Sequence, residues 1–229
     1  FHEILERFVL DVLARPEAEH PGFGAGWTDA DRDALIRIGR EVCDEYERRG
    51  VTGRPVFWRR ERRQIEADLH QFLDSDDARR AAVGATPLAA ELPFGLVGGG
   101  PAVGAPPARG RVVGVRGEAH RIGLAGEGEL LVVDYKTGSD FKFKGLSEAD
   151  PHLNGRCLQL VVYGLAARAH AGDHHAPVSA HYWFTSKKRR FKLMGYPVGQ
   201  DVFETVAGAV HTIVSGIETG LFPAHPEEP

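Results

Sequence analysis

An aspartate and a lysine stand two positions apart at the polar end of an apolar stretch. The stretch reads Val132-Val133-Asp134-Tyr135-Lys136, which is typical of a β-strand. Because side chains alternate along a strand, Asp134 and Lys136 share one face. The carboxylate can hold a divalent cation through oxygen, and the ammonium can orient water or stabilise charge on a phosphate. An isolated Asp-x-Lys tripeptide is more often a surface ion pair, so the pattern alone does not establish a site.

A histidine is expected near this pair. Residues Gly117–Arg121 end or bend a neighbouring strand, which places His120 within reach of Asp134. Neutral imidazole is a ligand for Mn²⁺ or Zn²⁺, whereas Mg²⁺ prefers hard oxygen. Glu118 shares the face of His120 but lies about 6–7 Å further along the strand, so it replaces a ligand there poorly.

Two further polar side chains follow on a predicted helix over residues 158–169. Gln159 and Tyr163 are four positions apart, and this spacing puts them on one helical face. They are candidates to contact a phosphate or the nearby lysine. Polar residues at this spacing are also typical of the edge of an amphipathic helix.

The elements that must position these groups change in type along the chain. Apolar residues recur at helical spacing through the first 80 residues, with a helix start at Thr28-Asp29. Strands alternate with helices after that point, which predicts an α/β domain with a mixed sheet. Helices are predicted over residues 1–13, 29–49, 57–73, 158–169 and 202–217. Strands are predicted over 87–94, 111–124, 129–135, 179–185 and 190–195, with a flexible Gly/Pro/Ala loop over 98–110.

The composition sets limits on what the chain can be. It is 42% apolar and 26% charged over 229 residues, which excludes wholesale disorder. Its 28 basic and 32 acidic residues give a net charge of −4, which argues against a histone-like polycation. No apolar run is long enough to cross a membrane, and two cysteines are too few for a disulfide framework or a four-cysteine cluster. We expect a single domain over residues 1–229, with a helical part over 1–80 and a sheet-containing core over 85–229, from a larger intracellular protein.

The Asp-x-Lys strand and the Gln-x-x-x-Tyr helix together resemble the PD-(D/E)XK nucleases of the RecB/AddB type. His2, in the sequence His2-Glu3-Ile4-Leu5-Glu6, matches the early helical histidine of that family, and Glu91 fits an acidic strand residue upstream of the catalytic aspartate. The resemblance spans nearly the whole chain. It implies a restriction-endonuclease-like mixed central sheet flanked by helices, with an N-terminal helical segment.

The resemblance also implies an activity and its site. The activity is that of a metal-dependent DNA exonuclease of the bacterial cytoplasm, acting in repair and recombination on a single strand or a duplex end, with a helicase domain or subunit as partner. The catalytic residues would be Asp134, Lys136, Gln159 and Tyr163. The ligands for Mg²⁺ or Mn²⁺ would be His2, His120, Asp134 and the carbonyl of Tyr135. No phosphate-binding Gly-x-x-x-x-Gly-Lys-Ser/Thr motif occurs, so any ATP-driven motor lies elsewhere.

Basic residues occur shortly after the Asp-x-Lys motif and again over residues 187–190. In a DNA enzyme they would neutralise backbone phosphates without reading sequence, although charge runs of this kind are often only solvated surface. The candidates are Lys142, Lys144, Lys187, Lys188, Arg189 and Arg190.

The chain departs from the family pattern at one position. Where the family has Gly-x-x-Asp-Arg, this chain has Gly117-Glu118-Ala119-His120-Arg121, so His120 replaces a carboxylate that binds the metal. We therefore expect either a changed metal preference or impaired cleavage. A nuclease-dead DNA-binding or scaffolding module of a helicase–nuclease complex is the alternative function. An unrelated α/β domain, in which Asp134 and Lys136 form only an ion pair, is the third possibility.

Many members of the AddB branch also bind a four-iron cluster. Its cysteines lie before the early histidine helix and after the last helix. With two cysteines, Cys43 and Cys157, a 4Fe-4S cluster is not possible within these residues. It remains possible in the parent protein.

Overall fold

The computed structural model describes residues 1–95, 103–108, 111–186, 188 and 190–221. Five α-helices are present in this part of the chain, together with one short 3-10 turn between the first two helices and another ahead of the fourth. Their bounds are α1 His2–Leu13, α2 Asp29–Arg48, α3 Pro55–Val83, α4 Gln159–Ala171 and α5 Gln200–Thr219, with η1 at Glu17–Glu19 and η2 at Phe141–Phe143. Within the described ranges, no helix is long and apolar enough to cross a membrane.

A five-stranded mixed sheet lies at the centre of the molecule. Its order is β1-β4-β5-β6-β7, and a separate two-stranded sheet pairs β2 with β3. Only β5 and β6 run parallel in the large sheet, and the other neighbours are antiparallel. The strands are β1 Ala85–Phe94, β2 Val103–Ala108, β3 Arg111–Val115, β4 Gly117–Ala125, β5 Leu130–Lys136, β6 Val178–Phe184 and β7 Leu193–Pro197.

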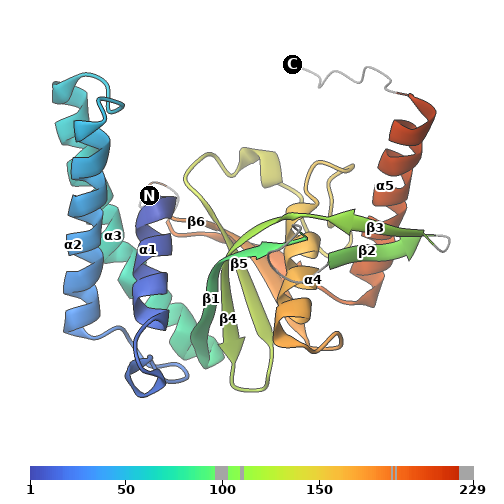
Figure 1. Cartoon of the computed structure of the whole chain (residues 1–229), viewed down its shortest axis with the longest axis horizontal. Coiled ribbons are helices and arrows are strands. Elements are labelled where there is room, and N and C mark those ends of the chain that lie inside the picture. The colour runs from blue at the N-terminus through green and yellow to red at the C-terminus, as the bar shows by residue number, and fades with distance from the viewer. Residues whose placement is uncertain (96–102, 109–110, 187, 189, 222–229) are drawn as a thin grey trace.

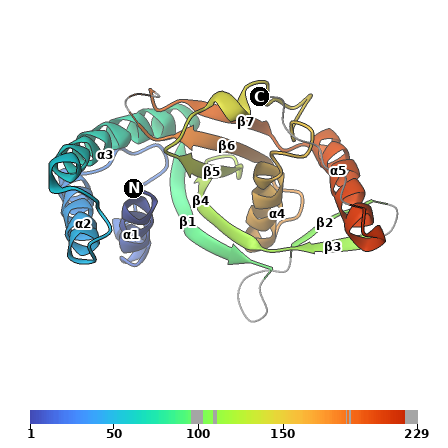
Figure 2. The same ribbon diagram turned by 90° about the horizontal axis from the view of Figure 1, so that it is seen from above.

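The sheet separates two apolar cores. Helices α1, α2 and α3 lie on one side of it, and α4 and α5 lie on the other (Figures 1 and 2). Along β5 the side chains alternate between the cores: Val132 joins the core of α4 and α5, whereas Val133 and Tyr135 join the core of α1–α3. The predicted mixed sheet flanked by helices, with a helical N-terminal segment, is therefore confirmed.

Local sequence signals explain several element boundaries. Thr28 caps α2 in a reciprocal capping box, in which its side chain accepts from the Asp31 amide and Asp31 accepts from the Thr28 amide. Helix α3 begins at Pro55, a favoured first helical position, and ends at Gly84 in the left-handed conformation. The helix start predicted at Thr28-Asp29 is thus confirmed in detail.

Three predicted elements differ from the structure. Helix α3 continues to Val83 instead of ending near Leu73, because its last turns bury the charged residues Asp76 and Arg80 and so carry no apolar stripe. The predicted loop over 98–110 contains strand β2; residues 96–102 and 109–110 lie outside the described ranges. Residues 111–124, predicted as one strand, form two strands in different sheets. Strand β4 begins at Gly117, opposite the last residue of β1, Phe94, whereas β3 lies before it and pairs with β2.

A buried ionic cluster joins α3 to the centre of the sheet. The Arg121 guanidinium on β4 donates to both oxygens of Asp76 at 3.0 and 3.1 Å. Trp27 Nε1 donates to the same carboxylate at 2.9 Å, and Arg80 Nε lies 3.2 Å from it. Asp76 is completely buried, and the neighbouring arginines hold its pKa below the ordinary value even though burial opposes this. Asp76 thus pairs with two buried arginines, and Asp77, 3.2 Å from Arg80 Nη2, pairs with one of them as well.

Replacing this carboxylate tests the cluster. Asp76→Asn removes the negative charge and leaves the buried Arg121 without its carboxylate partner, so the free energy of unfolding should fall by about 3–5 kcal/mol. Asp74→Asn is the matched control, since Asp74 pairs with Arg32 but keeps 70% of its side chain exposed, and it should cost less than about 1 kcal/mol. Urea unfolding of both variants makes the comparison. Equal losses in the two variants would contradict the assignment.

A second buried titratable group lies on β6. His181 Nδ1 is buried without a hydrogen-bond partner. Burial, and then the charge of Arg79, lower the pKa of His181 from 6.5 to about 4. Protons therefore bind the unfolded chain more tightly than the folded one at this position. The resulting stability is present in full above pH 6.5 and is lost as the pH falls toward 4.

His181→Gln should remove this dependence. Between pH 7.5 and pH 5, wild type should lose about 1–2 kcal/mol more of its unfolding free energy than the variant does. His170→Gln, at an exposed position of α4, should behave as wild type. Chemical denaturation at the two pH values measures the difference. Parallel pH curves for wild type and His181→Gln would rule out His181 as the sensitive group.

Candidate active site

Asp134 and Lys136 lie together near the end of β5. The Asp134 side chain is 0% exposed, and Lys136 Nζ lies 2.5 Å from its Oδ2 atom. The pair is therefore not a surface ion pair, which was one of the interpretations that the sequence left open. Burying a carboxylate is unfavourable unless cations or donors compensate it, so this pair indicates a site rather than a solvated face.

His120 approaches the same carboxylate from the adjacent strand β4. Its Nδ1 atom lies 3.1 Å from Asp134 Oδ1 and accepts a hydrogen bond from the Tyr135 amide at 3.2 Å. An Nδ1 atom that accepts from an amide has its lone pair, not a proton, at that position. Although His120 and Lys136 lie within ion-pair distance, neither oxygen of Asp134 has a hydrogen bond of acceptable geometry. The lone pairs of His120 Nδ1 and Asp134 Oδ1 thus lie close together.

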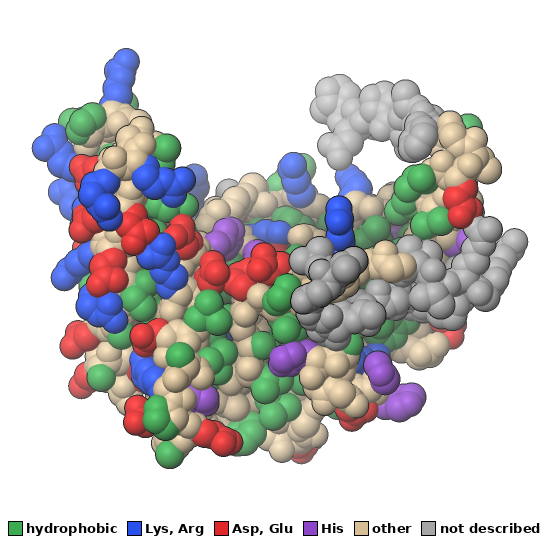
Figure 3. Space-filling view, viewed as in Figure 1, with side chains coloured by type: hydrophobic (Ala, Val, Ile, Leu, Met, Phe, Trp, Pro, Cys, Tyr) green, Lys and Arg blue, Asp and Glu red, His purple; other side chains and the backbone are tan. Residues whose placement is uncertain are grey.

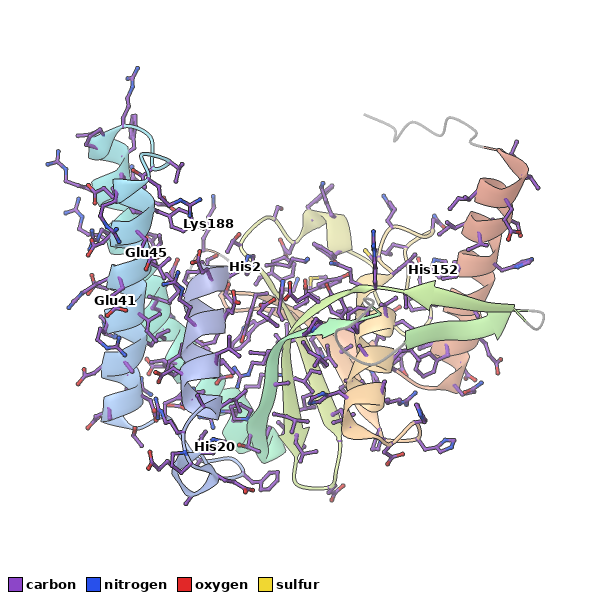
Figure 4. All side chains as sticks on the ribbon, in the orientation of Figure 1. His2, His20, Glu41, Glu45, His152 and Lys188 are labelled. Carbon is purple, nitrogen blue, oxygen red and sulfur yellow. The ribbon has the colours of Figure 1, made fainter. Side chains whose placement is uncertain are left out.

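His2 reaches the site from the first turn of α1. Its Nε2 atom donates to the carbonyl oxygen of Tyr135 at 2.8 Å, and its ring centre is 5.2 Å from that of His120. Burial lowers the pKa of His2, and the hydrogen bond to Tyr135 opposes this only in part. The imidazole is therefore neutral at pH 7, which is the form that binds metal ions. Figure 4 shows His2 at the upper end of α1.

The donor atoms fit a divalent cation that tolerates nitrogen. Neighbouring ligands of an octahedral ion lie about 3 Å apart when each is about 2.1 Å from the metal. The pairs His120 Nδ1–Asp134 Oδ1 at 3.1 Å and His2 Nε2–Tyr135 O at 2.8 Å have this spacing. To bind the cation, His2 would give up its hydrogen bond to Tyr135 and carry its proton on Nδ1, which frees the Nε2 lone pair. In the part of the chain that the structure describes, no three His, Cys, Asp or Glu side chains are grouped to hold a metal by themselves. The Tyr135 carbonyl, 2.8 Å from His2 Nε2, is a further oxygen that such a ligand set could use.

Helix α4 supplies the next contacts. Lys136 Nζ donates to Gln159 Oε1 at 3.3 Å, and Gln159 Nε2 in turn contacts the Tyr163 hydroxyl at 3.3 Å. Burial raises the pKa of Tyr163 to about 12, which keeps the phenol protonated. Because Gln159 and Tyr163 are four residues apart on α4, their side chains form a hydrogen-bonded chain that ends at Lys136. The structure brings together His2, His120, Asp134, Tyr135, Lys136, Gln159 and Tyr163, and their chemical roles remain predictions.

Further carboxylates surround this group. Glu91 on β1 lies between residues paired with Ala119 and Arg121, so it is opposite His120, and its φ of 42° is in the left-handed region. Burial, followed by the charges of Glu6, Glu118 and Asp134, raises the pKa of Glu91 to about 7. Acidic and histidine side chains gather on the floor of the hollow seen in Figure 3. The repulsion between these carboxylates is one reason why Glu91 keeps its proton to a higher pH than usual.

Sequence reasoning missed two features near the site. Glu6 lies four residues after His2, and that helical spacing could have placed the two side chains on one face of α1. A cavity of about 560 Å³ adjoins His2 between α1, α2 and α3, with Phe1, Tyr46 and Trp58 in its wall. No local pattern could have shown the cavity, because it forms between segments that are distant in the sequence.

The predicted DNA-binding residues are only partly described. Lys142 lies within η2 and Lys144 directly after it, and both are exposed. Lys188 and Arg190 are exposed between β6 and β7, and Figure 4 shows Lys188 on the same upper side as His2. Lys187 and Arg189 lie outside the described residues. Nothing in this placement assigns a ligand to any of them.

Comparison with known proteins gives one family. The chain is similar to a solved structure titled "Crystal structure of SSO0001" at 10% identity, with a TM-score of 0.27 and an alignment over 92% of this chain and 84% of that one. No curated protein matches the chain. The model of the PD-(D/E)XK nuclease superfamily matches residues 1–229, and the mixed five-stranded sheet with flanking helices is consistent with the restriction-endonuclease-like fold. The chain belongs to the PD-(D/E)XK nuclease superfamily.

Proposed function

We propose that this chain is a metal-dependent deoxyribonuclease that hydrolyses phosphodiester bonds. The observation that carries the proposal is the buried carboxylate of Asp134, whose two oxygens lack hydrogen bonds although Lys136 and His120 lie within 3.1 Å of them. A buried, electron-rich position beside a lysine suits a divalent cation and a phosphate together. Membership of a nuclease superfamily supports the same chemistry.

Each residue has a role that follows from its atoms. Asp134, His120, His2 and the Tyr135 carbonyl would hold Mg²⁺ or Mn²⁺. The bound cation would supply Lewis-acid stabilisation of the charge that develops on the phosphate. Lys136 would orient the attacking water or stabilise that charge, because its ammonium is a compact donor of hydrogen bonds.

Gln159 and Tyr163 would act on Lys136 rather than on the phosphate. The Gln159 carbonyl accepts from Lys136 Nζ, while the Tyr163 hydroxyl fixes the Gln159 amide. The Gln159 side-chain amide is thereby a second partner for the Lys136 ammonium, in competition with Asp134. The two helix residues are thus positioning groups for the lysine.

The finer assignment rests on motif resemblance. The order of His2, Asp134-x-Lys136 and Gln159-x-x-x-Tyr163 favours a RecB/AddB-type exonuclease, acting in DNA repair and recombination and linked to a helicase. The substrates would be single strands or duplex ends. A nuclease-dead DNA-guiding module is the second candidate, and the observation that favours it is His120 at the position of a metal-binding carboxylate.

Cleavage of linear DNA decides between these functions. We expect wild type to cut with Mn²⁺ and more weakly with Mg²⁺, since imidazole is a poorer ligand for the harder ion. His120→Asp should shift the preference toward Mg²⁺ by at least tenfold, a change of about 1.4 kcal/mol. Asp134→Asn and Lys136→Gln should each lower the rate by about 10²-fold or more.

Controls separate loss of chemistry from loss of fold. Asp74→Asn, at an exposed position of α3, should cut as wild type does. His120→Asp combined with Asp134→Asn should lose the gain in Mg²⁺-dependent cleavage. If wild type and His120→Asp are both folded and leave DNA intact with either metal, the nuclease proposal is wrong and the DNA-guiding module takes its place.

The lysines of the η2 turn are proposed phosphate contacts. Exchanging both for alanine (Lys142→Ala with Lys144→Ala) should weaken binding similarly for different DNA sequences. It should also reduce the slope of log affinity against log salt by about 1–2, because each neutralised phosphate contributes about 0.7–0.9. Arg37→Ala, on a side chain that is 57% exposed on α2, is the control. Fluorescence anisotropy over a salt series measures the slope, and an unchanged slope would remove these lysines from the interface.

A further inference from the structure

An aromatic side chain is presented to solvent directly after the active-site strand. Phe141 is 77% exposed and lies five residues beyond Lys136, at the start of η2. Lys142 and Lys144 follow it and are also exposed. An exposed ring is therefore displayed on this turn, followed by two exposed lysines and preceded by Asp140, which pairs with Lys192.

The turn is fastened to the sheet by its neighbours. The ring of Phe143 packs 4.4 Å from that of Tyr182 and 5.6 Å from that of Phe184, measured between ring centres. Lys192 Nζ on the other side donates to Asp140 at 3.1 Å. Phe143 is held inward while Phe141 remains outside, so the exposure of Phe141 belongs to an anchored turn.

The same contacts place the turn beside the candidate active site. Lys136 Nζ lies 5.0 Å from the centre of the Tyr182 ring, and that ring also packs against Phe143. One aromatic side chain thus separates the active-site lysine from the turn. Figure 1 shows this segment rising on the upper side of the molecule, where the N-terminal end of α1 also lies.

The chemistry of the turn selects its ligand. An aromatic ring beside cations is the combination that binds single-stranded nucleic acid, because the ring stacks on a base while the cations meet the phosphates. A protein partner would need a contiguous apolar patch, and Phe141 stands next to lysines instead. Phe23 shows the contrast: it is 57% exposed, but its neighbours are Gly22 and Gly24.

We propose that Phe141 stacks on an unpaired base of the bound DNA strand, next to the phosphodiester that Lys136 faces. The inference rests on the proposed nuclease function and deepens it. Bases inside a duplex are already stacked on each other, so only a single strand or a frayed end can offer a base to this ring. The turn would therefore give the site a preference for single-stranded DNA over duplex DNA.

Binding without cleavage tests the inference. Fluorescein-labelled single-stranded and blunt duplex DNA would be titrated with the whole chain in Ca²⁺ or without metal, and followed by anisotropy. Phe141→Ala should weaken single-strand binding by about tenfold, within the range for losing one base–aromatic stack, and change duplex binding less than twofold. Phe141→Trp should retain wild-type binding. Phe23→Ala should match wild type on both ligands.

A second measurement reports stacking itself. A single strand that carries 2-aminopurine should lose fluorescence on binding wild type and Phe141→Trp, and Phe141→Leu should abolish that loss while keeping an apolar side chain. If wild type binds DNA but Phe141→Ala binds single strands equally well, or weakens both ligands alike, the stacking inference is wrong while the nuclease proposal stands. If wild type binds no DNA, both fail.

Discussion

The antiparallel pairing of β4 with β5 is the constraint on which the site depends. Because side chains alternate along both strands, the same two neighbouring positions serve opposite faces. His120 meets Asp134 on the side of α4, whereas Arg121 lies on the other side with Tyr135 and reaches Asp76 on α3. If β4 were shifted by one residue against β5, His120 would turn toward the face of α3 and Arg121 toward the face of α4. Neither the polar site nor the ionic cluster could then form. The ionic cluster therefore fixes the register that places the histidine beside the aspartate.

The two faces handle charge in different ways. In the ionic cluster, Arg121 and Arg80 contact the carboxylate of Asp76, and Asp77 also pairs with Arg80, so the charges are largely compensated within the protein. At the candidate site, carboxylates outnumber nearby cations, and Glu91 responds with a raised pKa. Compensated charge gives rigidity, whereas uncompensated charge gives affinity for an external cation. The fold thus places a rigid ionic cluster directly behind a surface that attracts cations.

Local patterns predicted the parts of the molecule that local physics determines. The apolar spacing of α1, the cap at Thr28 and the alternation that sets Asp134 beside Lys136 could all be found in the sequence. The partnership of Asp76 with Arg121 could not, since the two residues are 45 positions apart and a lone aspartate on a helix carries no sign of its partner. Strand β2 was missed because a segment rich in Gly, Pro and Ala has no periodicity of side chains to read.

His120 shows that attracting a metal ion and coordinating it are separate requirements. A carboxylate at this position would contribute both a negative charge and a hard oxygen, whereas neutral imidazole contributes neither. Negative charge is still present nearby, because the carboxylates of Glu6, Glu118 and Asp134 all act on Glu91. Neighbouring carboxylates are thus kept, while the direct ligand at this position is softer. A site of this kind selects among divalent ions by the chemistry of its donors rather than by its overall charge.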